Sequence, residues 1–128
     1  MAEPLRVRVV TPESPVFDGV ADLVVVPAHD GEMGILPRHV RFLGALGVGE
    51  LRLSRGGELQ RFFLEGGFVQ VRPGFVTVLC DRATPLDGLD PAALEAAAAQ
   101  ARAAGAPNAA ALQERAVVAR RVAARRRE

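Results

Sequence analysis

The 128 residues suit one ordinary domain, or a domain of about 85 residues with an appendage of about 40. No apolar run approaches the roughly 20 residues of a membrane-spanning helix, the N-terminus lacks the pattern of a secretory signal, and the single cysteine, Cys80, excludes an intramolecular disulfide. All sixteen basic residues are arginine, which excludes a phosphate loop with its lysine and covalent catalysis by a lysine amine.

The first part of the chain is predicted to form short strands. Residues 5–10 alternate apolar and polar, and residues 23–26 form the continuous apolar run of a strand covered on both sides. Further strands are expected at 51–54, 59–64, 68–71 and 75–80. The pairs between them predict turns at Asp30-Gly31, Gly56-Gly57, Gly66-Gly67 and Pro73-Gly74. Strands at about 8–12-residue spacing favour a sandwich or barrel, and six phenylalanines between residues 17 and 75, mostly at core-like positions, place the main core here.

The segment 88–128 is predicted to be a helical hairpin. Asp90 can cap a helix that starts at Pro91, and nine of the fourteen residues from 91 to 104 are alanine. Gly105 and Pro107 end this helix, and Asn108 can cap a second one that runs to about residue 127. Because the connection is short, the two helices are expected to be antiparallel neighbours.

The second helix combines a small apolar seam with a basic collar. The seam, Leu112, Ala116, Ala119 and Ala123, buries little area, so the hairpin is expected to dock only weakly. The collar is spread around the helix and opposed in this helix only by Glu114 and Glu128. Its six arginines are Arg115, Arg120, Arg121, Arg125, Arg126 and Arg127. A solvated tail, an acidic protein partner and nucleic acid remain open as interpretations of the collar.

The sequence contains no recognisable catalytic or metal-binding motif. His29 and His39 match no standard zinc spacing, and neither Ser14 nor Ser54 lies in a nucleophile elbow. Cys80 falls in the same strand phase as Val76 and Val78 and is expected to be buried. No metal and no cofactor is implied, and the residues by themselves predict a non-catalytic binding or structural subunit.

Several sequence blocks resemble, in the right order, the epsilon family of rotary F-type ATP synthases. They are VVTPE at 9–13, FDG at 17–19, LVVVP at 23–27, GEMGILPRH at 31–39, GGFVQV at 66–71 and VTVLCD at 76–81. The resemblance implies a mostly β fold with added α structure. A ten-stranded β-sandwich, 1–87, would bind the gamma subunit and the ring of c subunits, and a C-terminal antiparallel helical hairpin, 88–128, would follow it.

The resemblance also implies a non-catalytic central-stalk subunit that couples rotation of the c-ring to ATP synthesis. Its place would be the cytoplasmic face of a bacterial plasma membrane, with a chloroplast thylakoid less favoured, and it would be attached to the membrane only through the complex. The alternative is a free-standing β-sandwich module whose arginine-rich tail binds nucleic acid. For the central-stalk subunit that the resemblance implies, no nucleic-acid partner is expected.

Contact residues follow from the same resemblance. The family's c-ring-facing loop corresponds to Gly31, Glu32, Met33 and Gly34, with Glu32 as an exposed carboxylate able to meet a basic loop, and His39 matches a position near the interface of gamma and the ring. When the hairpin extends along gamma it can hinder ATP hydrolysis, and Arg115, Arg120 and Arg121 are then expected to face an acidic segment of the beta subunit.

Simpler readings remain for two of these residues, and the sequence departs from the family pattern at two positions. Glu32 could only solubilise its turn, and His39 could only pack. An ATP-binding motif of some bacterial members is matched here by Leu89 and Asp90 but has Ala93 in place of its arginine, so ATP binding is not expected. Arg38 replaces the glycine usual before the histidine.

Overall fold

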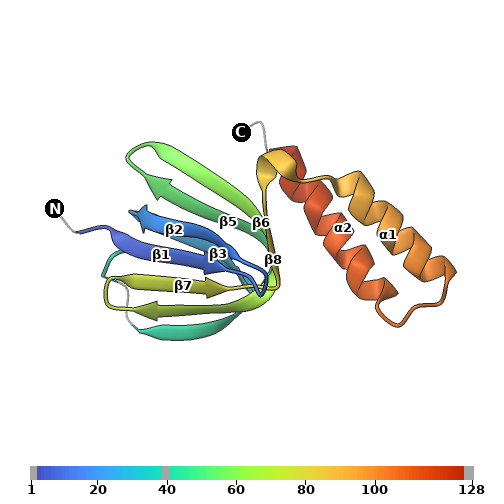
Figure 1. The fold of residues 1–128 in the computed structure, drawn as a ribbon, viewed down its shortest axis with the longest axis horizontal. Coiled ribbons are helices and arrows are strands. Elements are labelled where there is room, and N and C mark those ends of the chain that lie inside the picture. The colour runs from blue at the N-terminus through green and yellow to red at the C-terminus, as the bar shows by residue number, and fades with distance from the viewer. Residues whose placement is uncertain (1–2, 39–40, 126–128) are drawn as a thin grey trace. The chain divides into compact units, whose positions relative to one another are not determined.

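The computed structural model describes residues 3–38 and 41–125. The chain forms two compact units, Met1–Thr84 and Pro85–Glu128, the first built of strands and the second of helices (Figure 1). The boundary falls close to the one expected after residue 87.

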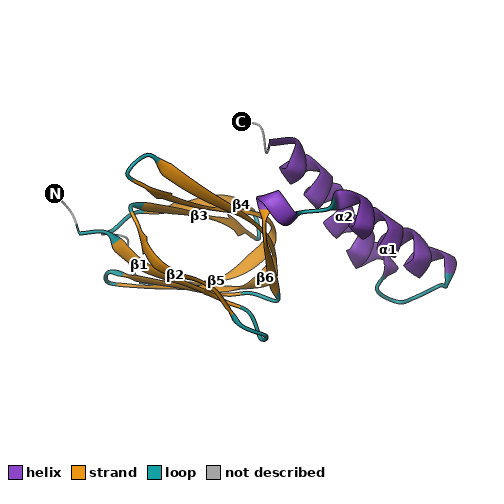
Figure 2. Ribbon diagram, turned by 45° about the horizontal axis from the view of Figure 1, so that its top comes forward, coloured by secondary structure: helices purple, strands orange, loops and turns teal. Residues whose placement is uncertain are grey.

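The strands form one sheet that folds over into two layers (Figure 2). In chain order they are β1 (Leu5–Val10), β2 (Pro15–Ala21), β3 (Leu23–Ala28), β4 (Gly31–Ile35), β5 (Phe42–Arg55), β6 (Glu58–Arg72), β7 (Phe75–Leu79) and β8 (Arg82–Pro85). Their order across the sheet is β2-β1-β7-β6-β5-β3-β4, and β8 pairs with β6. β1 and β7 are parallel, and the neighbouring pairs along the rest of this path are antiparallel.

The long strands β5 and β6 take part in both layers. Residues 42–45 pair with 68–71 next to β7, whereas residues 52–54 pair with 59–61 next to β3. The expected count of ten strands is wrong, because the described residues contain eight. One difference is that β6 stays continuous where two separate strands, 59–64 and 68–71, were expected. The turn expected at Gly66-Gly67 is wrong for the same reason. Both glycines lie inside β6, with φ of 68° and 117°, a backbone conformation that admits glycine at little cost.

Two of the predicted hairpin turns are confirmed. Gly56 and Gly57 both have positive φ, 55° and 86°, as a primed two-residue turn requires, and they connect the paired residues Arg55 and Glu58. Pro73-Gly74 connects β6 to β7, with Gly74 at φ 78°. The turn between β3 and β4 is one residue earlier than expected, because it is formed by residues 29 and 30, and Gly31 already belongs to β4.

The core lies between the two layers and is filled by alternate strand residues. It consists of buried side chains from residues 5 to 80, among them Val7, Val9, Val24, Val26, Ile35, Leu51, Leu64, Val69, Val71, Val76 and Val78. The predicted main core in this part of the chain is thus confirmed. The expectation that the phenylalanines are mostly at core-like positions is wrong, because Phe42, Phe68 and Phe75 are exposed.

The second unit contains a short 3-10 turn (Leu86–Gly88) and two helices, α1 (Pro91–Ala103) and α2 (Ala109–Ala124). The Asp90 carboxylate accepts a hydrogen bond from the Ala93 N–H at 3.3 Å, so the predicted N-cap is confirmed. The first helix ends in a Schellman motif: Gly105 has φ 66°, its N–H donates to the Arg102 carbonyl, and the Ala106 N–H donates to the Ala101 carbonyl.

The second helix departs from expectation in two details. Asn108 occupies the N-cap position, but within the described part of the chain its side chain makes no capping hydrogen bond. The predicted seam is shifted: Ala116 and Ala119 are buried as expected, but Val122 is buried in place of Ala123. Neither helix, as far as the structure describes them, has the length and apolar character needed to cross a membrane.

Candidate functional site

The residues expected to face the c-ring lie in a strand, not in a loop. Gly31, Glu32, Met33 and Gly34 all belong to β4, which pairs with β3 from Val24–Ile35 to Ala28–Gly31. Because side chains alternate along a strand, these four residues do not share one surface. Met33 packs against the core, whereas Glu32 points outward. The loop assignment is wrong, and Glu32 is the polar group that this strand presents.

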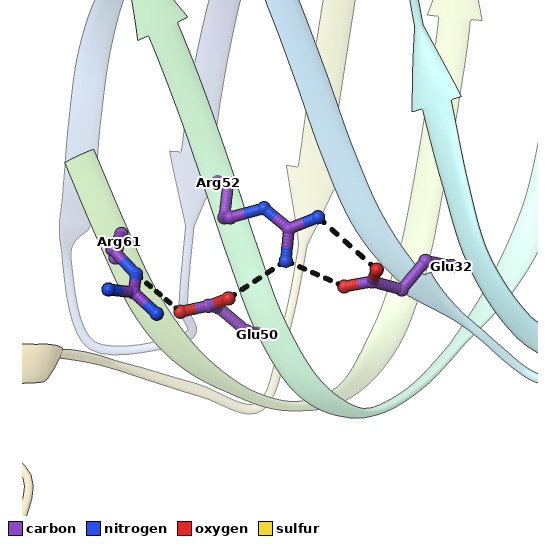
Figure 3. Close-up of polar contacts among 4 residues, drawn as sticks. All are labelled: Glu32, Glu50, Arg52 and Arg61. Carbon is purple, nitrogen blue, oxygen red and sulfur yellow. Dashed lines mark hydrogen bonds and ion pairs between the residues drawn. The ribbon is translucent and has the colours of Figure 1, made fainter. Parts of the chain in front are cut away.

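Glu32 forms a two-point ion pair with an arginine from another strand. The Arg52 guanidinium donates from Nη1 to Glu32 Oε2 at 2.8 Å and from Nη2 to Glu32 Oε1 at 3.2 Å. The same Nη1 donates to Glu50 Oε1 at 2.8 Å. Arg61 Nε donates to the other oxygen of Glu50 at 2.6 Å. Arg61, Glu50, Arg52 and Glu32 therefore form one chain of alternating charges, which we call the β4–β6 ion chain (Figure 3).

Exposure to solvent rises along this ion chain from Glu50 to Glu32. The Glu50 side chain is 1% exposed, that of Arg61 15% and that of Arg52 26%, whereas that of Glu32 is 47% exposed. The hydrogen bond to Glu32, more than the one to Glu50, raises the pKa of Arg52 above its ordinary value, although burial opposes this. The inner members are thus fixed and shielded, and Glu32 is the most exposed member, which solvent or a partner can reach.

A second surface was missed by reasoning from the sequence. On the outer face of β5, β6 and β7, four large apolar side chains are exposed, and we call them the apolar strip: Leu43, Phe68, Phe75 and Leu79. Phe68 lies directly opposite Leu79 in the β6–β7 ladder. Phe68 is 56% exposed and Leu79 is 50% exposed. The signal was present in the strand alternation. Phe68 is in phase with the outward Gln70 and Arg72, not with the buried Val69 and Val71.

Clustered apolar exposure of this kind has a physical meaning. Single exposed leucines are common on soluble proteins, but adjacent exposed aromatic and aliphatic side chains mark surfaces that bind other proteins. One edge of the strip carries a cation, since the Arg72 guanidinium lies 5.1 Å from the centre of the Phe75 ring. In the ladder, Gln70 and Thr77 separate Phe75 from the Phe68–Leu79 pair, so the strip combines apolar and polar groups, as protein–protein interfaces do.

The structure also modifies the picture of the basic collar. Arg120 on α2 pairs with Glu95 on α1 at 2.8 Å, so an acid from the first helix opposes the collar, which the sequence did not predict. This pair joins the early part of α1 to the late part of α2, as an antiparallel hairpin requires. Arg115 is half-buried and Arg121 is exposed. Arg126 and Arg127 lie outside the described residues, as does His39.

The possible metal ligands and the single thiol are the remaining side chains that bear on chemistry. No group of three or more His, Cys, Asp or Glu side chains in these segments could hold a metal ion. Cys80 is buried, as predicted, and its Sγ lies 3.6 Å from the Val10 carbonyl oxygen. Burial, with a smaller contribution from the charge of Asp81, raises the pKa of the thiol to about 11. The thiol is therefore a poor nucleophile near neutral pH.

These features define a class of protein: a β-sandwich followed by a helical hairpin, with an ion chain and an apolar strip on the outer faces of the sandwich. The family described as "ATP synthase, Delta/Epsilon chain, beta-sandwich domain" matches residues 4–86. The chain belongs to this family.

Relatives agree with this assignment. The ATP synthase epsilon chain of Acidithiobacillus ferridurans is 48% identical over 90 residues, which cover 68% of this chain and 64% of that protein. The ATP synthase epsilon chain of Bacillus subtilis is 39% identical over 92 residues, which cover 72% and 70%. That of Alkalihalophilus pseudofirmus is 44% identical over 86 residues, covering 67% and 65%. The match thus spans slightly less than two thirds of the length of the Acidithiobacillus and Alkalihalophilus proteins.

Solved structures show the same fold. A chain of the Euglena gracilis mitochondrial ATP synthase, in a structure of OSCP, F1 and c-ring, superposes with a TM-score of 0.69 at 24% identity, covering 91% of this chain and 74% of that one. A chain from the central stalk and c-ring of the Tetrahymena thermophila mitochondrial ATP synthase gives a TM-score of 0.57 at 18% identity, covering 69% and 71%.

Proposed function

We propose that this chain is a non-catalytic rotor subunit of a proton-translocating F-type ATP synthase, and that it couples rotation of the c-ring to ATP synthesis. The observation that carries the proposal is the family match over residues 4–86, which covers nearly the whole sandwich. The epsilon chains named above, and structural relatives that come from ATP synthases, support the same assignment.

The two surfaces of the sandwich suit two different partners. The apolar strip requires an apolar protein surface, and we assign it to the gamma subunit. Glu32, the most exposed member of the β4–β6 ion chain, is suited to a further basic group, and we assign it to the polar loops of the c-ring. Gly31, Gly34 and the core-packed Met33, which holds the strand, are assigned to the same contact. His39 is assigned to the same region from the family resemblance alone.

The hairpin is proposed to regulate hydrolysis. In its extended form Arg115, Arg120 and Arg121 would meet an acidic segment of the beta subunit, because opposite charges attract across such an interface. The chain would be held at the membrane only through the complex, at the cytoplasmic face of the plasma membrane, since the three relatives described above are bacterial proteins. No feature of the described residues favours the free-standing nucleic-acid module over this role.

Co-purification from membranes tests the proposal. Affinity-tagged full-length chain should recover gamma and the c-ring in stoichiometric amounts. A Phe68→Ser and Leu79→Ser double variant should lose gamma, because polar hydroxyls remove apolar area from the strip. Leu59→Ser is the matched control, since Leu59 is also 51% exposed but lies outside the strip. Recovery of the chain alone, or with nucleic acid in a salt-dependent way, would contradict the proposal.

A further inference from the structure

The register of β5 and β6 creates an electrostatic problem on the outer face of the sheet. Arg52 lies directly opposite Arg61 in the ladder, and like charges at directly opposite positions destabilise a sheet. Glu50, two residues before Arg52 on the same face, accepts hydrogen bonds from both arginines, at 2.8 and 2.6 Å. Its side chain is 1% exposed, so the two guanidinium groups replace the water that a buried carboxylate would otherwise need.

This arrangement fixes the position of Arg52 and directs its remaining donors toward β4. β3 lies between the two strands, with Val25 paired on one side to Arg52 and on the other to Gly34. The Arg52 side chain spans this strand and donates to both oxygens of Glu32, at 2.8 and 3.2 Å. A planar guanidinium bound at two points sets the orientation of a carboxylate as well as its charge. Lysine, a single point charge, cannot reproduce that geometry.

We propose that Arg52 is a positioning residue for docking: anchored by the buried Glu50, it sets the direction of the Glu32 carboxylate that meets a basic group on the partner. The inference rests on the proposed function, in which that partner is the polar loop region of the c-ring. Glu32 is then a carboxylate held in place before docking, and its partner gains a hydrogen bond without having to order a mobile side chain.

A double-mutant cycle on docking tests this. Tagged full-length chain is titrated onto synthase complex that has been depleted of this subunit, with Glu32→Gln, Arg52→Gln and the double variant compared. Each single variant should weaken docking by roughly tenfold, the scale of one charge-assisted hydrogen bond. The double variant should dock no worse than Glu32→Gln, because Arg52 acts through Glu32. Arg55→Gln is the charge-matched control on the same strand, and it should dock like the unmodified chain.

The Arg52→Lys variant separates the effect of Arg52 on the direction of the Glu32 carboxylate from its effect on the stability of the sandwich. Lysine keeps the positive charge beside Glu50, so the sandwich should unfold at an unchanged or slightly lower temperature, yet docking should weaken as much as in Arg52→Gln. Unchanged docking by Arg52→Lys would overturn the inference. So would a double variant whose loss of docking free energy equals the sum of the losses in Arg52→Gln and Glu32→Gln.

The outcomes also separate the inference from the proposed function. If the unmodified chain does not bind the depleted complex, the rotor role itself fails, and the inference fails with it. If the unmodified chain binds and Glu32→Gln binds equally well, the positioning role is overturned while the rotor role stands.

Discussion

Gly67 lies against the backbone of Cys80, so closely that a Cβ built on the glycine would be 2.6 Å from the Cys80 Cα. The same Cβ would also overlap the backbone carbonyl of Leu79, and φ at Gly67 is +117°. Both obstacles are backbone, which cannot move aside as a flexible side chain can.

Gly67→Ala should therefore destabilise the sandwich by roughly 2–5 kcal/mol, from overpacking and a strained φ together. Gly57→Ala is the matched control. It also has a positive φ, but nothing lies within 4 Å of its Cβ position, so it should cost only about 1 kcal/mol. Urea unfolding of the two variants measures the difference, and equal midpoints would show that the close approach at Gly67 has no energetic consequence.

Alkaline pH should lower the free energy of unfolding through the single thiol, Cys80. The pKa of Cys80 is raised from 9.0 to about 11, so between these values the unfolded chain has lost a proton that the folded chain retains. The stability contribution is fully present below pH 9 and is lost as pH rises toward 11, by roughly 2–3 kcal/mol in all.

This alkaline effect is unusually easy to isolate, because the chain has no tyrosine and all sixteen basic residues are arginine. The free energy of unfolding, measured at intervals from pH 8.5 to 11, should fall in the natural chain and stay level in Cys80→Ala. A parallel fall in both proteins would show that another process, not the thiol, destabilises the fold at high pH.

Removing the anchor of the β4–β6 ion chain should cost much more than removing a surface charge. Glu50→Ala leaves Arg52 and Arg61 facing each other with no carboxylate between them, and loss of one member of a buried ion pair costs about 3–5 kcal/mol. Asp18→Ala, which removes an exposed partner of Arg6 at 3.7 Å, should cost at most about 1 kcal/mol. Chemical denaturation of both variants measures the two costs, and a Glu50→Ala cost as small as that of Asp18→Ala would refute the prediction.

The elements predicted correctly are those fixed by neighbouring residues in sequence. Alternation at residues 5–10, positive φ at Gly56-Gly57 and the Asp90 cap all express local preferences, and each is confirmed. Gly66-Gly67 carries the same local signal as a turn, but it serves the close approach of β6 to residues 79 and 80, which no local pattern records.

The candidate site shows the same limit. Glu32 could be singled out from its sequence block, but its partner Arg52 is twenty residues away and is brought near by the β4–β3–β5 pairing. The pairing of Arg120 with Glu95 likewise depends on how two helices align, which composition and helical periodicity do not specify.

The sandwich should fold without the hairpin. All the side chains of the main core cluster come from residues before 84, and the second unit forms its own helical pair. A chain ending after Asp87 should remain soluble and unfold in one cooperative thermal transition. Far-ultraviolet circular dichroism during heating is the measurement, and a chain that stays unfolded would contradict the division into two parts.

The last prediction concerns the collar. Arg120 is paired with Glu95 in the folded hairpin, and since both side chains are well over one third exposed, the pair contributes only about 0.2–1 kcal/mol. An acidic segment of the beta subunit would compete for the same arginine, so a small change at Glu95 should shift the balance between folded and extended hairpins.

Glu95→Gln should therefore strengthen the inhibition of ATP hydrolysis in the assembled complex, because it releases Arg120 from its partner in the hairpin. Replacing Arg115, Arg120 and Arg121 by alanine should relieve inhibition while synthesis and assembly persist, and raising salt should weaken inhibition more in the natural chain than in this triple variant. For Glu95→Gln, the control for the change in net charge is Glu114→Gln, which removes an exposed acid of α2. Steady-state hydrolysis at low salt is the measurement: equal rates for the natural chain and the triple variant would mean that the collar is only a solvated tail.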